Sequence, residues 1–180
     1  QSWLNRRVGV FPMMPCGKCP QCRKEQYEMC QSYNYLGSRT DGGFAEYVRV
    51  PVWNLIELPD NVSFEQASML EPASVAVHAI RGIEMNAKES AVGCGLGTIG
   101  LLIVMFLRSM GVQDIYVIGN KKMQRKMAME FGVPGEHFCD TREQDVVEWM
   151  NSVTAGQGAD VFFDCVGKSQ VLEQAIQCVC

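Results

Sequence analysis

Four cysteines near the start of the chain have the spacing of a metal-binding loop. They are Cys16, Cys19, Cys22 and Cys30, in the pattern C-x2-C-x2-C-x7-C. Thiols so close in sequence seldom meet the geometry of a disulfide, whereas four thiolates readily form the closed tetrahedral shell of a structural zinc ion. An iron–sulfur cluster and a disulfide framework stay open as alternatives, although the seven-residue gap and the odd total of nine cysteines are less typical of either. A closed zinc site would stabilise a loop and leave any reaction to other residues.

A glycine loop forms a second pattern with chemical meaning, because the segment 95–100 reads G-x-G-x-x-G. Gly95 allows a tight turn, Gly97 lets the backbone approach a pyrophosphate, and Gly100 lets the following helix pack on its strand. Thr98 and Ile99 would begin that helix and present amide groups to phosphates. The motif lies between a strand-like run and a helix-like run, the context typical of a dinucleotide site. A glycine-rich turn that serves packing alone is the alternative.

The end of the second expected strand bears on which dinucleotide would bind. In such sites an acidic residue at this point usually bonds the ribose 2′-hydroxyl, but here Gly119 and Asn120 occupy it. Three cations follow at Lys121, Lys122 and Arg125. A small residue followed by cations can accept a 2′-phosphate, so we expect NADP to be tolerated or preferred over NAD. A solvated helix start is the alternative for these lysines.

The composition fits an ordinary globular protein, with 47% hydrophobic residues, 20% charged residues and a net charge of -4. The acidic balance argues against nucleic acid as a partner. No apolar run reaches the roughly 18 residues of a membrane helix, and without a signal sequence a cytoplasmic location is expected. Since the chain starts at Gln1 and stops inside a helix-like run at Cys180, we expect a fragment of a longer protein. The lone cysteines Cys94, Cys139, Cys165 and Cys178 are expected to be small buried hydrophobic residues.

The elements that must position these residues fall into two parts. Residues 1–62 are rich in glycine, proline and aromatic residues, with strands predicted at 8–11 and 44–50. Ser63 and Gln66 form a capping-box pattern that predicts a helix start. Pro72 is expected to break or restart that helix, so that the next helix runs over 73–83.

From residue 88 onward, strand-like and helix-like runs alternate. Strands are predicted at 89–94, 114–118, 136–139 and 160–166, and helices at 98–110, 121–131, 141–153 (capped by Thr141) and from 169 to the end. This alternation predicts an α/β fold in which a parallel sheet has helices on both faces. Four strands would make the sheet incomplete against the usual six.

Taken together, these motifs resemble a known family. The cysteine loop, the stretch G-G-F-A-E-Y at 42–47, the pair Glu71-Pro72 and the glycine loop are similar to the zinc-dependent medium-chain alcohol dehydrogenases, most of all to their polyol branch. The resemblance implies an incomplete doubly wound Rossmann sheet over 76–180. It also implies that residues 1–75 are the C-terminal part of a β-rich GroES-like catalytic domain with a zinc lobe.

The same resemblance implies two zinc ions, one structural at the four cysteines and one catalytic. Of the usual catalytic ligands only Glu71 can be matched here, because the others come from an earlier segment; a solvent-exposed helix-end carboxylate is the alternative. Val166, in the turn after the last strand, corresponds to the border of the nicotinamide ribose. The catalytic zinc would polarise an alcohol oxygen while hydride passes to NADP or NAD.

The function expected from this resemblance is hydride transfer between a secondary alcohol of a polyol or polyol phosphate and a nicotinamide cofactor. A zinc-independent reductase of the same superfamily and a non-catalytic, zinc-stabilised dinucleotide-binding module are the alternatives. The expected partners are a small-molecule alcohol and a second or further copies of the chain, as a homodimer or homotetramer, with no nucleic acid and no membrane. The fragment alone is expected to be inactive.

Overall fold

A computed structural model describes residues 2–180. The chain divides into two compact units between Glu71 and Pro72. We call them the first unit (residues 2–71) and the second unit (Pro72–Cys180). Within the described residues no helix has both the length and the apolar character needed to cross a membrane.

A four-stranded parallel sheet forms the centre of the second unit. Its strands are β5 (Ala91–Cys94), β6 (Ile115–Gly119), β7 (Phe138–Asp140) and β8 (Val161–Asp164), in the order β7-β6-β5-β8. The register places Cys94 of β5 beside Ile118 of β6 on one side and Asp164 of β8 on the other. The chain leaves β5 toward β6 on one side of the sheet and later returns to β8 on the other. The carboxyl ends of β5 and β8 therefore flank a topological switch point, where ligands of α/β sheets usually bind.

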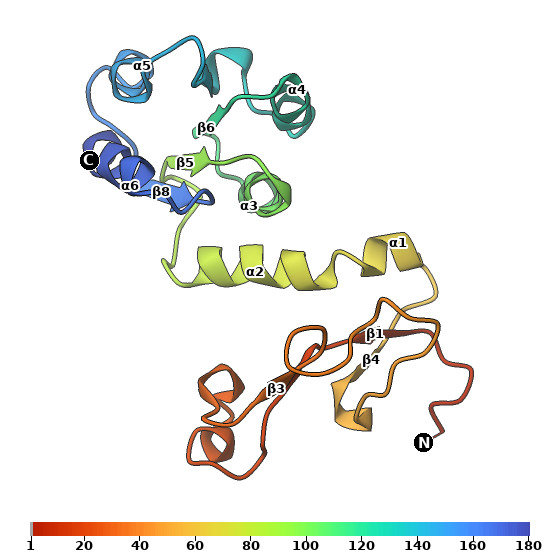
Figure 1. Cartoon of the computed structure of the whole chain (residues 1–180). Helices are drawn as coiled ribbons and strands as arrows, with labels where there is room; N and C mark the ends of the chain where they lie inside the picture. The colour runs from red at the N-terminus through yellow and green to blue at the C-terminus, as the bar shows by residue number, and fades with distance from the viewer. Residues whose placement is uncertain (1) are drawn as a thin grey trace. The chain divides into compact units, whose positions relative to one another are not determined.

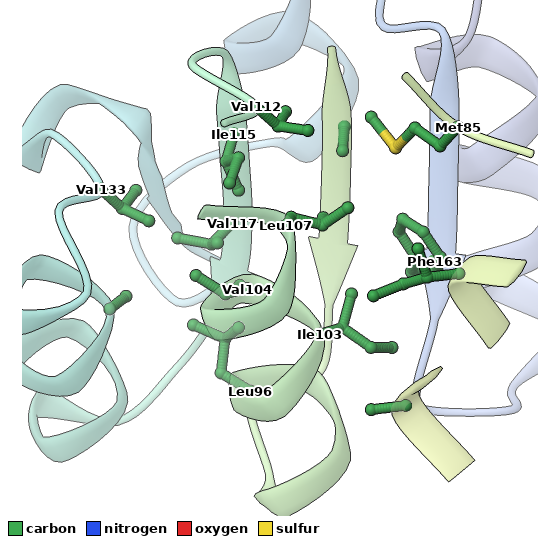
Figure 2. Packing of buried hydrophobic residues seen from close by; sticks show 14 of the residues in the cluster. Met85, Leu96, Ile103, Val104, Leu107, Val112, Ile115, Val117, Val133 and Phe163 are labelled. Carbon is green, nitrogen blue, oxygen red and sulfur yellow. The ribbon is translucent and has the colours of Figure 1, made fainter. Parts of the chain in front are cut away.

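Helices cover both faces of this sheet, as Figure 1 shows for α3 (Thr98–Ser109) and α4 (Lys122–Glu130) on one side and α5 (Val146–Val153) and α6 (Ser169–Cys178) on the other. Strand residues alternate between two apolar layers, because successive side chains of a strand point to opposite faces. One layer joins Ala91 and Val117 to Ile103, Val104 and Leu107 of α3 (Figure 2). The other joins Val92 and Ile118 to Trp149 of α5 and Val171 of α6. The predicted doubly wound parallel arrangement is confirmed.

The first unit is built from short paired strands and loops. Strand β1 (Val8–Val10) pairs antiparallel with β4 (Leu55–Glu57), and β2 (Met13–Met14) pairs antiparallel with β3 (Asn34–Tyr35). The cysteine loop connects β2 to β3. A buried amide holds the two ladders together, since Asn54 donates to the carbonyls of Phe11 (2.7 Å) and Met13 (2.6 Å).

The strand predicted at 44–50 is wrong. No described strand includes these residues, and the Phe44 and Tyr47 side chains are almost fully exposed. An alternating pattern produces a strand only where a neighbouring strand takes its hydrogen bonds and a core takes its apolar face. No ladder among residues 2–180 supplies such a neighbour to this segment.

Two helix boundaries also differ from expectation. Helix α1 (Phe64–Ala67) begins at the predicted Ser63–Gln66 capping box, but α2 (Leu70–Arg81) runs through Pro72. Proline is tolerated there because it is the third residue of the helix, and the first-turn N–H groups have no intrahelical acceptor. Helix α5 is capped by Asp145, which accepts from two backbone N–H groups, and not by Thr141.

Candidate functional site

The four cysteines of the loop converge on one point, as their spacing predicts. Their Sγ atoms all lie within 4.8 Å of one another. The Cys16–Cys22 and Cys19–Cys30 sulfur pairs are 3.9 Å and 4.0 Å apart, far longer than a disulfide bond of about 2.05 Å. A tetrahedral ion with zinc–sulfur bonds of about 2.3 Å would separate its ligands by about 3.8 Å. The cluster therefore has the dimensions of a closed four-thiolate metal site.

Backbone amides around the cluster favour thiolates at some positions. The backbone N–H groups of Cys22 and Gln31 lower the pKa of Cys19 to about 6, and those of Lys18 and Cys19 lower the pKa of Cys16. Burial raises the pKa of Cys22 to about 12. An ion bound here would displace the proton of Cys22 in particular, because a metal ligates the thiolate form.

The glycine loop has the backbone conformation that its sequence predicts. Gly95 has a φ of +89°, and a Cβ on it would lie 2.6 Å from the Val166 side chain. A Cβ on Gly100 would lie 2.3 Å from the Gly95 carbonyl oxygen. Gly97 differs from both, since a Cβ there would meet nothing within 4 Å. Gly95 and Gly100 are thus required by packing, while Gly97 keeps open space in front of the helix.

Helix α3 begins directly after this open position. Gly97 is its N-cap and supplies no side-chain cap, and Thr98 is exposed while Ile99 is partly buried. The N–H groups of a first helical turn lack intrahelical acceptors and carry the positive end of the helix dipole. This loop can therefore bind a phosphate or pyrophosphate with backbone donors.

A cleft of about 620 Å³ opens at the carboxyl end of the sheet in the second unit. Its lining brings together Gly95 of the glycine loop, Val166 after β8, and the cations Lys121 and Lys168. Asp164 shapes the β8 side, because its carboxylate accepts from the N–H groups of Val166 (2.8 Å) and Gly167 (3.0 Å). Of the predicted dinucleotide residues, Gly95, Gly119, Asn120, Lys121 and Val166 line this one cleft, whereas Gly97, Thr98, Ile99 and Gly100 are not part of its lining.

Sequence reasoning missed Gln124, which lines the same cleft. Its Oε1 atom accepts from the N–H groups of Asn120 and Lys121, both at 3.2 Å, and so fixes the loop after β6. The signal was present as Lys121-x-x-Gln124, since a glutamine three residues after a helix N-cap is half of a capping box. Lys168 was also missed, and no local pattern marks it, because only the fold brings the start of α6 to the ends of β5 and β6.

Glu71 lies apart from the cysteine cluster. It is exposed in the first turn of α2 and lines a small cleft with Val8 and Phe64. Burial, and secondarily the Glu71 charge, raise the pKa of Tyr35. Across residues 2–180, the only group of three or more metal-ligating side chains that could hold an ion is the four-cysteine cluster. The chain therefore brings Glu71 together with no further set of ligands.

The second unit has a cleft at the carboxyl end of a parallel sheet, and the first unit has a four-thiolate cluster. This combination is typical of proteins that bind both a metal ion and a nucleotide. Residues 4–60 match the alcohol dehydrogenase GroES-like domain, and residues 98–180 match the zinc-binding dehydrogenase model. The chain belongs to the zinc-binding dehydrogenases.

Individual relatives agree with this family. The chain is 29% identical to sorbitol dehydrogenase of Bacillus subtilis over 99% of its length and 50% of that protein. It is 34% identical to L-threonine 3-dehydrogenase of Pyrococcus horikoshii, over 96% of the chain and 49% of that protein. The same identity holds for galactitol 1-phosphate 5-dehydrogenase of Escherichia coli, over 94% and 49%. The chain thus spans about half the length of the curated relatives it matches.

Solved structures show the same fold. Galactitol-1-phosphate dehydrogenase from Escherichia coli superposes with a TM-score of 0.86 at 29% identity, covering 97% of this chain and 50% of that one. A zinc-binding dehydrogenase from Sinorhizobium meliloti, crystallised with NADP, gives a TM-score of 0.87 at 27% identity, over 97% and 51%. Both likenesses extend over the first and second units.

Proposed function

We propose that this chain supplies the structural zinc lobe and the nucleotide-binding sheet of a zinc-dependent oxidoreductase. The whole protein would transfer a hydride between a secondary alcohol of a polyol or polyol phosphate and NADP or NAD. The observation that carries this proposal is the combination, on one chain, of a four-thiolate cluster and an open glycine loop at a sheet switch point. We assign residues 1–75 to the GroES-like catalytic domain and 76–180 to the Rossmann domain.

The residues of the second unit bind and orient the cofactor. The N–H groups of Thr98 and Ile99, in the first turn of α3, have no intrahelical acceptor and are suited to the pyrophosphate, while Gly97 leaves open space in front of them. Gly100 allows α3 to approach the carbonyl of Gly95, and Gly95 itself lines the cleft. Val166 forms the apolar wall on the β8 side, suited to the nicotinamide end.

Two metal roles are assigned to the first unit. Cys16, Cys19, Cys22 and Cys30 hold the structural ion, and Glu71 is proposed as a ligand of the catalytic ion. A catalytic ion held with the help of Glu71 would supply Lewis-acid polarisation of the alcohol oxygen, which favours loss of the alcohol proton. The carboxylate of Glu71 is suited to this role because it is exposed and free to bind a cation in a small cleft.

The proposed setting is a homodimer or homotetramer in the cytoplasm with a small-molecule alcohol as substrate. The relatives' printed names, which are sorbitol, threonine and galactitol phosphate dehydrogenases, support the substrate class. Within residues 2–180 no disulfide joins any of the nine cysteines, which supports a reducing compartment.

Cofactor titration of a glycine variant tests the nucleotide site. Gly97→Ala places a methyl group in open space, so it should fold normally and yet weaken NADPH and NADH binding by about tenfold, or about 1.4 kcal/mol. Gly43→Ala is the matched control, because a Cβ on Gly43 also meets nothing within 4 Å and Gly43 belongs to the first unit. Unchanged cofactor affinity in the folded Gly97 variant would refute the site.

Metal analysis separates the enzyme from a non-catalytic module. The full protein should contain two zinc ions per chain, one of which is lost when Glu71 is changed to Ala, with the loss of alcohol oxidation. A protein that binds NADPH and one zinc but oxidises no polyol would favour the zinc-stabilised binding module. A carefully prepared protein with no zinc would end the proposal.

A further inference from the structure

The loop after β6 has a glycine where a side chain could reach the cofactor ribose, and Gln124 fills the adjacent space. A Cβ added to Gly119 would lie 2.9 Å from the Gln124 Oε1 atom and 3.3 Å from the Phe138 ring. A side chain at 119 and the observed Gln124 conformation therefore exclude one another. Whatever group contacts the ribose from this edge of the cleft has to come from the loop or from α4.

Hydrogen bonding fixes which end of the Gln124 amide the loop after β6 engages. Its Oε1 atom accepts from the N–H groups of Asn120 and Lys121, and only the oxygen of an amide can accept. The Nε2 atom must then point away from those two groups. Gln124 is partly buried and lines the cleft, and no acceptor for Nε2 is found within residues 2–180. Two amide hydrogens are thus available to a ligand.

The three cations after β6 are not equivalent in the structure. Arg125 donates to the Gly135 carbonyl (3.3 Å) and lies over the Phe138 ring, 5.6 Å from its centroid. Neither Arg125 nor Lys122 is among the residues that line the cleft, whereas Lys121 is. No ion pair within the described chain occupies Lys121.

We propose that the Gln124 amide, with the Lys121 ammonium beside it, selects NADP over NAD in this cleft. This rests on the proposed function, because it names the residues that read the cofactor. A ribose 2′-phosphate offers only acceptor oxygens and negative charge, which match an amide donor and an ammonium. A carboxylate at this place would instead accept from a 2′-hydroxyl and repel the phosphate. Gln124 therefore determines specificity, and Gly119 leaves it the space to do so.

The test compares NADPH and NADH dissociation constants in the full chain by titrating nicotinamide fluorescence. The wild type should bind NADPH about tenfold or more tightly than NADH, the size expected of one or two charge-assisted hydrogen bonds. Gln124→Glu keeps an oxygen for the Asn120 and Lys121 N–H groups while replacing the amide donor by an anion. It should lower the NADPH preference by about tenfold or more and change the NADH constant by less than about threefold.

Met123→Glu is the matched control. It adds the same charge on the neighbouring residue of α4, at an exposed side chain that does not line the cleft, and should leave the preference within about twofold. Gln124→Met removes both the amide donor and the amide acceptor without adding a charge, and it should reduce the NADPH preference part of the way. This variant replaces Gln124→Glu in the test if the Glu variant does not fold.

The outcomes distinguish this inference from the function on which it rests. Loss of NADPH preference in Gln124→Glu, with NADH binding retained and Met123→Glu unaffected, supports the inference. An unchanged ratio in the Gln124 variants, or tighter NADH binding by the wild type, overturns it while leaving the nucleotide site intact. If neither cofactor binds the wild type, the proposed function itself is wrong.

Discussion

The two units of this chain differ in what stabilises them. In the first unit the buried hydrophobic residues are Cys22, Cys30 and Leu58, whereas the second unit buries two continuous apolar layers on the faces of its sheet. Two of those three residues are members of the metal cluster. A unit of about 70 residues with so little apolar burial needs a cross-link such as a metal. We infer that a metal ion at the cysteine cluster would substitute for a core in the first unit, which is only part of its proposed domain, whereas the second unit has apolar layers of its own.

Removal of a cysteine ligand should have the largest effect and should be confined to the first unit. Cys30→Ser takes away one of four thiolates, and structural zinc contributes on the order of 10 kcal/mol to folding in small domains. We expect one zinc ion per chain to be lost, measured by metal analysis, and the thermal transition of the first unit to disappear. Cys180→Ser, at an exposed cysteine outside the cluster, should keep both. Full zinc content in Cys30→Ser would contradict the comparison.

A cavity in the sheet core should have the next largest effect and should be confined to the second unit. Leu107 is 1% exposed and packs from α3 into the apolar layer on this face of the sheet (Figure 2). Leu107→Ala should lower the free energy of unfolding of the second unit by about 2–5 kcal/mol, measured by urea unfolding. Met105→Ala, on the exposed side of the same helix at 36% exposure, should change stability by less than about 1 kcal/mol. Zinc content is expected to stay constant in both variants.

Helix caps provide a smaller version of the same comparison. The Asp145 carboxylate accepts from the N–H groups of Val147 (2.9 Å) and Glu148 (3.0 Å) at the start of α5. Asp145→Ala should cost about 1 kcal/mol, measured by urea unfolding, while Asp145→Asn should be nearly neutral. Ser63→Ala removes the analogous cap from α1, a helix of four residues, and should affect unfolding less. An equal effect of both caps would contradict the expected dependence on helix length.

The smallest expected effect is a pH dependence at one end of the sheet. The backbone N–H and hydroxyl of Ser90 lower the pKa of Asp160, with both contacts at 2.7 Å. A carboxyl group with a lowered folded-state pKa adds stability above its ordinary pKa, and this stability is lost as the pH falls below about 4. Asp160→Asn should reduce the loss of unfolding free energy below about pH 4, by less than about 1 kcal/mol because solvent screens this exposed group. If the variant lost as much unfolding free energy at acid pH as the wild type, the Ser90–Asp160 contact would make no contribution to the pH dependence.

Features carried by short stretches of sequence could be predicted. The cysteine cluster, the turn at Gly95 and the cap at Ser63 each depend on residues within about one turn or loop, so spacing alone was informative. The four strands were also predictable in order, because strand and helix periods alternate cleanly after residue 88.

Features decided by distant neighbours could not be predicted. The alternation at 44–50 looks like a strand, but pairing depends on another segment. Pro72 was expected to interrupt a helix, yet its effect depends on its place in the first turn. The sequence places three cations after β6, and only the structure shows that Arg125 lies over the Phe138 ring while Lys121 and Gln124 line the cleft.

Hydrogen exchange with and without a strong zinc chelator tests the central comparison most directly. We predict that chelation removes protection from the cysteine loop and its flanking strands, residues 13–35, while β5, β6 and the α3 helix keep their protection and NADPH is still bound. If the sheet of the second unit lost protection together with the loop, or if the loop stayed protected in metal-free protein, zinc would not be the substitute for a core in the first unit.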